Sequence, residues 1–344
     1  MDEGLDGNQG LIPDTRAALD PERTAGPQGR QKLDEMAQQT QQLPPGPPKS
    51  AGPVPRAKAN SFSALLHRSP RLRLAGLVTA PALWLVLVYI AALAALLITA
   101  FWTVDTFTGE VSTEWTTENI VTVLTDPVYQ RITLRTVWIA VAVTVIDMIL
   151  ALPIAFFIAK VAPARWEKLL VVAVLMPLWA SYLVKAYAWR NVLAEGGLLE
   201  WLGAPIGLSS PGYGETAVIL TLSYIWLPYM ILPIYAGFDR VPDSLLEASG
   251  DLGAKPLTTM RLVMLPLLVP SIIAGTIFTF SLSLGDYITA QIVGGTTQML
   301  GTVVYANVGA ANNLPFAAAV SLVPIAIIMF YLFIVRRTGA LNSL

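Results

Sequence analysis

Two carboxylates placed among apolar residues are the side chains of this 344-residue sequence with the clearest chemical potential. Asp147 lies within the apolar run VWIAVAVTVIDMILALPIAFFIA, and Asp286 directly precedes Tyr287 in SLSLGDYITA. A carboxylate within a membrane helix normally faces the bundle interior or water, and a carboxylate beside an aromatic ring can hold an ammonium group. We therefore expect Asp147 either in a cation pathway or as a hydrogen-bonded acid that joins helices. For Asp286 and Tyr287 the alternatives are a cation site and ordinary placement at the membrane boundary.

Aromatic side chains gather in the two apolar runs around residues 180 and 225. Those near the ends of the runs are typical of the membrane interface. Three lie deeper and are candidates for lining a translocation path, with packing in the helix core as the alternative for each: Tyr182, Tyr224 and Trp226. The candidate pathway residues are therefore two acids and a small set of aromatics.

The side chains that most enzymes use are missing from this sequence. It has no cysteine, and its single histidine, His67, lies outside the apolar part. This excludes disulfides, thiolate nucleophiles, Cys-based or His-cluster metal sites and histidine-dependent triads. No G-x4-G-K-[ST] phosphate-binding loop occurs either. We expect no catalytic residues, no metal site and no cofactor in this chain.

The composition indicates a membrane protein. Hydrophobic residues make up 54% of the chain and charged residues 13%, with a mean hydropathy of +0.59, whereas soluble domains have about 25% charged residues. The formal net charge is −1, which gives no reason to expect a nucleic-acid partner.

Six apolar runs are long enough to cross a hydrocarbon core of ~30 Å, which takes about 20 helical residues. We expect spans at about 77–101, 137–159, 169–189, 216–238, 263–285 and 314–335. Their internal prolines are tolerated where neighbouring helices satisfy the freed carbonyl groups. The sequence thus predicts an all-α integral membrane protein with a six-span domain over residues 71–344.

Lysine and arginine residues are concentrated at one set of span ends. Because cytoplasmic loops are enriched in these residues, we expect that side to be cytoplasmic, and six spans then place both chain ends there. The opposite side carries more Asp and Glu residues than the side expected to be cytoplasmic. These acids either raise the local concentration of a cation or only solvate exposed loops.

Residues 1–70 differ from the rest of the chain in composition. They are rich in Pro, Gly, Gln and charged residues, and include the run PPGPP at 44–48. Such a segment cannot bury enough apolar surface to offset the entropy of ordering it. We expect a disordered cytoplasmic tail, with a docking segment that folds on a partner as the alternative.

The loop between the fourth and fifth spans, residues 239–262, is patterned like a docking element. Asp243 or Ser244 can cap a helix, with Glu247 at capping-box spacing from Ser244. Gly253 then ends the helix, and a second short helix at 257–265 leads into the fifth span. The first helix carries an apolar stripe: Leu245, Leu246, Ala248 and Leu252. A helix–glycine–helix elbow of this kind can offer its apolar side to a groove on a partner.

The spacing in this loop resembles the EAA loop of binding-protein-dependent ABC import permeases. The family pattern is E-A-A-x3-G-x9-I-x-L-P, and this chain has E-A-S-x3-G-x9-V-x-L-P from residue 247 to residue 266. The resemblance implies the type I importer permease fold. It also implies that the loop docks into a cleft of an ATPase subunit and that this subunit binds ATP and Mg. The loop residues given this docking role are Glu247, Ala248, Ser249 and Gly253.

Two further segments are similar to the B-type subunit of spermidine and putrescine permeases. They are 176–203, where Lys185 replaces the usual Arg, and 281–304, which contains GDYIT. The resemblance implies a polyamine cargo, an extracytoplasmic binding protein, a bacterial inner membrane with its lipid, and a second permease subunit. That subunit is either a C-type homologue or a second copy of this chain. The alternatives are an importer permease for another small solute or ion, such as ferric iron, and a secondary transporter without an ATPase.

Overall fold

The computed structural model describes residues 70–105, 108–207 and 209–337. The chain divides into two compact units, Met1–Val78 and Thr79–Leu344. The predicted tail over residues 1–70 lies outside the described residues except for Pro70. The elements that position the candidate sites all belong to the second unit.

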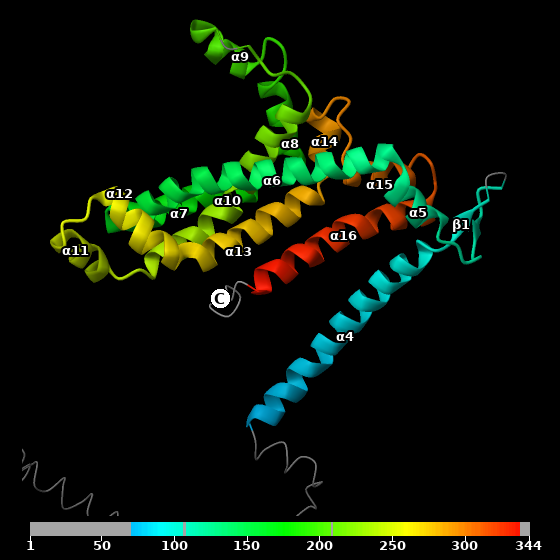
Figure 1. The fold of residues 1–344 in the computed structure, drawn as a ribbon, viewed down its shortest axis with the longest axis horizontal. Coiled ribbons are helices and arrows are strands. Elements are labelled where there is room, and N and C mark those ends of the chain that lie inside the picture. The colour runs from blue at the N-terminus through cyan, green and yellow to red at the C-terminus, as the bar shows by residue number, and fades with distance from the viewer. Residues whose placement is uncertain (1–69, 106–107, 208, 338–344) are drawn as a thin grey trace, which may run out of the picture. The chain divides into compact units, whose positions relative to one another are not determined.

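Five helical stretches of the described chain are long and apolar enough to cross a membrane: Leu77–Thr99, Pro127–Val161, Glu215–Asp239, Pro256–Leu284 and Leu314–Arg336. They correspond to α4 (Pro70–Thr99), α6 (Pro127–Phe156) with the π-helical turn η1 (Phe157–Val161), α10 (Glu215–Asp239), α12 (Pro256–Thr259) with η3 (Met260–Met264) and α13 (Leu265–Leu284), and α16 (Leu314–Arg337). Figure 1 shows α6, α10, α13 and α16 side by side. The expectation of an all-α membrane fold is confirmed.

The third predicted span, 169–189, is not one continuous helix. The structure has α7 (Ala164–Trp179) and α8 (Tyr182–Val192), which are bent by 93° relative to each other. Ala180 and Ser181 between them take extended backbone angles, and Pro177 removes a helical hydrogen bond just before the break. Counted as one broken span, this pair brings the total to six.

The second predicted span begins too late in the sequence. The structure starts α6 at Pro127, ten residues before the predicted position, and the Asp126 side chain accepts a hydrogen bond of 2.7 Å from the Val128 amide. An acidic N-cap followed by proline at the first helical position is a strong start signal. The extra turns carry α6 beyond the apolar run toward α5, α14 and α15 (Figure 1).

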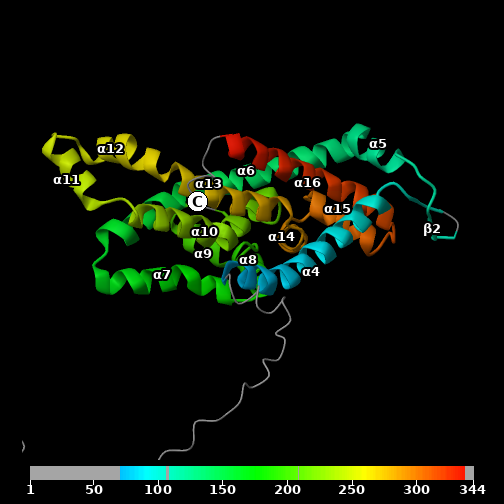
Figure 2. The same ribbon diagram turned by 90° about the horizontal axis from the view of Figure 1, so that it is seen from below.

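Short elements connect the long helices. After α4, two strands of two residues each, β1 (Thr103–Val104) and β2 (Val111–Ser112), pair antiparallel. The remaining elements are α5 (Glu118–Thr125), α9 (Leu198–Gly203), η2 (Ala204–Ile206), α11 (Asp243–Asp251), α14 (Ile288–Val293) and α15 (Leu300–Val308). In Figures 1 and 2, α11 and α12 lie at one end of the bundle and α14 and α15 toward the other.

The helices α6, α10 and α13 form the centre of the bundle and make its most extensive contacts. Glycines allow α10 and α13 to approach each other closely. A Cβ at Gly237 would lie 2.5 Å from the Ser271 hydroxyl, and one at Gly275 would lie 2.6 Å from the Met230 sulfur. A side chain at either position would force its neighbour to move, so glycine permits this close packing, as small residues do between membrane helices.

Candidate functional site

The patterned loop folds into a helix–turn–helix that we call the elbow, residues 243–264. The helix α11 ends where Gly253 adopts φ +76°, and Gly253 donates a backbone hydrogen bond of 2.8 Å to the Gly250 carbonyl. That left-handed conformation favours glycine, because a Cβ there is strained even where space is free. The chain then enters α12 and continues without a break into α13, so two short helices joined at Gly253 lead into the long helix.

The start of the elbow is held by a lysine of η1, the π-helical turn that follows α6. The Nζ of Lys160 donates hydrogen bonds of 2.7 Å to the Val241 carbonyl and to Oδ1 of Asp243. The expected capping box is wrong, because Pro242 occupies the N-cap position and makes no side-chain cap. Asp243 instead forms an ion pair with a lysine side chain that is only 10% exposed, which fixes the elbow to the bundle.

The elbow has an internal polar contact between Ser249 and Thr259, which we call the brace, and an exposed apolar surface. Ser249 is buried, and its hydroxyl lies 2.6 Å from the Thr259 hydroxyl, which joins the two short helices. Glu247 and Ala248 are exposed. Four leucines are exposed along the elbow by 42% to 89%: Leu245, Leu252, Leu257 and Leu262. Of the predicted stripe, Leu246 packs instead on the bundle core, so the exposed apolar surface extends across the glycine turn.

At the far end of the bundle, three side chains form what we call the clasp: Tyr182, Asp286 and Thr289. The Tyr182 hydroxyl donates to Oδ2 of Asp286 and lies 2.6 Å from the Thr289 hydroxyl. The Thr289 amide donates to Oδ1 of Asp286 at 2.9 Å. Asp286 is 7% exposed. Burial raises the pKa of its carboxyl, and the hydrogen bonds from Tyr182 and Thr289 oppose that rise.

Aromatic rings and a lysine surround the clasp. The Lys185 ammonium lies 6.0 Å from the centroid of the Tyr182 ring, which also packs on Trp226 at a centroid distance of 5.7 Å. The structure thus brings Tyr182, Trp226 and Asp286 into one neighbourhood. Tyr224 pairs instead with Trp189, at 5.4 Å.

Two of the predicted pathway residues lie apart from the clasp. Tyr287 stacks on Tyr305 at a centroid distance of 5.1 Å and lines a hollow among the end of α13, α15 and α16. Asp147 has no exposed surface and lies inside the contact of α6 with its neighbours. The adjacent residues Asp286 and Tyr287 therefore point into different surroundings.

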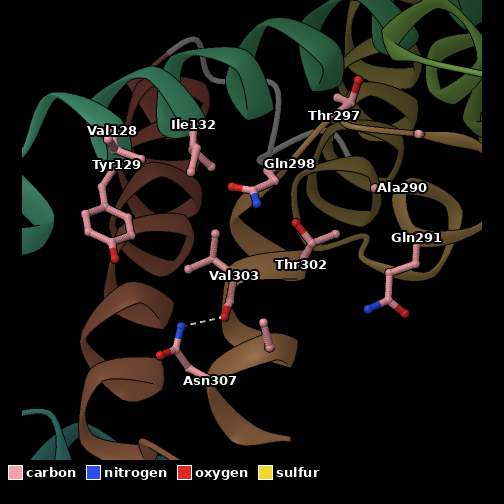
Figure 3. Close-up of a pocket in the computed structure, with 12 residues that line it drawn as sticks. Val128, Tyr129, Ile132, Ala290, Gln291, Thr297, Gln298, Thr302, Val303 and Asn307 are labelled. Carbon is pink, nitrogen blue, oxygen red and sulfur yellow. Dashed lines mark hydrogen bonds between the residues drawn. The ribbon is translucent and has the colours of Figure 1, made fainter. Parts of the chain in front are cut away.

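A pocket of about 440 Å³ lies between the first turns of α6 and the helices α14 and α15 (Figure 3). Its lining contains no charged residue, and its polar groups are amides, hydroxyls and a phenol: Tyr129, Gln291, Thr297, Gln298, Thr302 and Asn307. Asn307 donates to the Val303 carbonyl at 2.9 Å. The sequence reasoning missed this pocket, because it used the lining residues within 281–304 only for their family resemblance and neutral amides carry no charge that would mark a site.

Comparisons with known proteins agree with this architecture. Residues 132–338 match the family described as binding-protein-dependent transport system inner membrane component. The inner membrane ABC transporter permease protein YdcU of Escherichia coli K12 is 43% identical over 307 residues, covering 84% of this chain and 97% of that protein. The spermidine/putrescine transport system permease protein PotB of the same organism is 32% identical over 230 residues, covering 64% of this chain and 82% of its own length.

A solved structure shares the fold at low sequence identity. A bacterial alginate ABC transporter, in complex with a periplasmic protein that binds an alginate pentasaccharide, matches with a TM-score of 0.61 at 16% identity, covering 80% of this chain and 98% of that one. The family match extends over the elbow, the clasp, most of α6 and the whole of α10, α13 and α16. The chain therefore belongs to the inner membrane components of binding-protein-dependent transport systems, and it is the permease subunit of an ABC importer.

Proposed function

We propose that this permease imports polyamines such as putrescine or spermidine, driven by an ATPase that docks on the elbow. The observation that carries the proposal is the elbow itself, which exposes leucines on both sides of a fixed glycine turn while the Ser249 and Thr259 hydroxyls pair with each other. An apolar helical surface of this kind is stabilised when it is buried in a groove on another protein.

The elbow connects directly to the helices that enclose the bundle core. Because α12, η3 and α13 run on without interruption, a displacement of the docked elbow is carried along α13 to its far end. The Lys160 contacts couple the same elbow to the end of α6. ATP and Mg bound by the ATPase would thereby act on the helices while this chain performs no covalent chemistry.

The transport complex needs partners beyond the ATPase. A second permease subunit, a C-type homologue or another copy of this chain, encloses the pathway, and an extracytoplasmic binding protein delivers the cargo. The elbow end and both chain ends face the cytoplasm in this proposal. The lysine and arginine residues at that end support this orientation, among them Lys160, Lys255 and Arg336.

The polyamine cargo is supported by the PotB relatives and by the clasp. The similarity to PotB covers 64% of this chain. Asp286 offers a carboxylate among the rings of Tyr182 and Trp226, and a carboxylate with nearby aromatic faces suits an ammonium group. Tyr224, Tyr287 and Asp147 remain further candidates for the pathway.

Reconstitution tests this function directly. The chain would be purified in mild detergent with its associated proteins, placed in proteoliposomes, and assayed for uptake of radiolabelled putrescine with ATP inside. We expect uptake that requires both ATP and the binding protein. Uptake without ATP and the binding protein would indicate a secondary transporter. Import of ferric iron in place of putrescine would overturn the cargo but leave the importer intact.

A further inference from the structure

Buried polar side chains without hydrogen-bond partners are confined to three helices of the described chain. They are Asp147 on α6, then Thr221, Ser223 and Trp226 on α10, and Thr279 and Ser283 on α13. Asp147, Thr279 and Ser283 have no exposed surface. Buried polar groups in proteins are normally hydrogen-bonded, and exceptions commonly mark a bound water or ion.

Helix periodicity brings members of this set into the same part of the bundle. Ala151 and Met230 belong to one core cluster, and Gly275 lies against Met230. One helical turn from each of these three residues, away from the elbow, the helix presents a polar residue of the set: Asp147, Trp226 and Thr279. Ser223 faces the same carboxyl, although no hydrogen bond of ordinary geometry joins them.

The chemistry of these groups selects the kind of molecule that fits between them. A carboxylate accepts hydrogen bonds, an indole N–H only donates, and hydroxyls do both. A metal cation would leave the indole of Trp226 without a partner, and an anion would be repelled by Asp147. Water can accept from the indole and donate to the carboxylate, and a buried water typically makes about three hydrogen bonds.

We propose that α6, α10 and α13 enclose a cluster of bound water molecules around the Asp147 carboxyl. Each water bridges polar groups on different helices. The cluster gives the centre of an otherwise apolar bundle a set of directional contacts, and it supplies partners for the Asp147 carboxyl oxygens, which make no hydrogen bond of ordinary geometry to the described residues.

Radiolytic hydroxyl-radical footprinting tests the proposal on the assembled transporter in nanodiscs, because bound water is activated in place and oxidises its neighbours. Two buried methionines of one core cluster provide the readout. Met230 lies one helical turn from Trp226 and Met264 lies at the elbow end, and they are 0% and 2% exposed. We expect several-fold more oxidation at Met230 than at Met264.

Three variants of α6 sharpen this test. Asp147→Leu should lower Met230 oxidation to the Met264 level, whereas Asp147→Asn, which still binds water, should retain it. Thr144→Val is the matched control, because the Thr144 hydroxyl already donates to the Ala140 carbonyl at 2.7 Å, and it should also retain the signal. If Asp147→Leu does not assemble, Ser223→Ala combined with Thr279→Val gives the same readout.

Three results would overturn the proposal. Equal oxidation of the two methionines in the unmodified protein would show a dry core. Unchanged Met230 oxidation in Asp147→Leu, or in the double variant, would place the water elsewhere. A change in Met230 oxidation when choline replaces Na⁺ at equal ionic strength would assign the site to a cation.

Discussion

The elbow and the clasp lie at opposite ends of the bundle and distribute their side chains in opposite ways. The elbow turns leucines outward and buries one small hydroxyl brace, Ser249 with Thr259. The clasp buries a carboxylate and surrounds it with donors and rings from its own chain. The exposed leucines of the elbow therefore need another protein to cover them, whereas the clasp carboxylate already accepts hydrogen bonds from Tyr182 and Thr289 of this chain.

The largest expected effect comes from placing charge on the exposed surface of the elbow. Leu252→Glu with Leu257→Glu would force carboxylates into a docked apolar interface, and an unpaired buried charge costs several kcal/mol. We expect the ATPase to be lost on purification and ATP-driven uptake to disappear, while the permease still inserts. Leu202→Glu, an equally simple change at an exposed leucine of α9, is the control. If the double variant still bound the ATPase, the exposed leucines of the elbow would not form the docking surface, and the proposed contrast between the elbow and the clasp would be wrong.

The next effect tests whether the buried carboxylate of the clasp serves the cargo. Asp286→Asn keeps the side-chain shape and removes the charge, and losing a charged hydrogen bond costs about 1.5–3 kcal/mol. We expect polyamine uptake to fall by about tenfold to a hundredfold at matched expression, with ATPase binding intact. Tyr305→Phe keeps the stack on Tyr287 and should have no effect. Undiminished uptake in Asp286→Asn would make the clasp a purely structural contact.

A smaller effect is expected from the turn of the elbow. Gly253→Leu places a side chain in the left-handed region, where L-residues are disfavoured by about 1–2 kcal/mol. Uptake and stimulated ATPase activity should drop by about tenfold. Gly253→Asn tolerates this conformation and should retain most activity. If the two variants behave alike, the backbone angle of Gly253 is not what the elbow requires.

The smallest effect concerns the internal brace of the elbow. Ser249→Ala restores the alanine of the family pattern but removes the partner of the Thr259 hydroxyl, at a cost of about 1 kcal/mol. We expect a reduction of several-fold in ATPase affinity, measured by titrating the ATPase onto the permease in nanodiscs. Ser244→Ala, at an exposed position of α11, should leave affinity unchanged. An equal reduction in both variants would mean that the brace has no specific role.

Sequence reasoning succeeded where structure depends on neighbours along the chain. The apolar runs located the long helices because helix burial in lipid follows local hydropathy. The elbow followed from the spacing of Glu247, Gly253 and the L-P pair, since a glycine turn between two short helices is encoded within a few residues. Its left-handed Gly253 confirms the helix break.

Contacts between distant residues escaped prediction. The Tyr182–Asp286 hydrogen bond joins positions 104 residues apart, and Lys160 reaches Asp243 across 83 residues. Hydropathy cannot encode such pairs, because it carries no information about which faces of two helices meet. The break at 180–181 was missed for a related reason, since the apolar character of the segment continues through it.

The close approach of α10 and α13 at Gly237 and Gly275 has a practical consequence. Helix pairs in membranes associate through tight packing of small residues, without the exclusion from water that drives soluble folding. A detergent micelle should therefore preserve this pair as well as a bilayer does. Since the chain has no cysteine, one cysteine can be introduced on α10 and one on α13, and each can carry a spin label. The distance between the two labels should stay constant, so it can serve as a reference for measuring movement of the elbow.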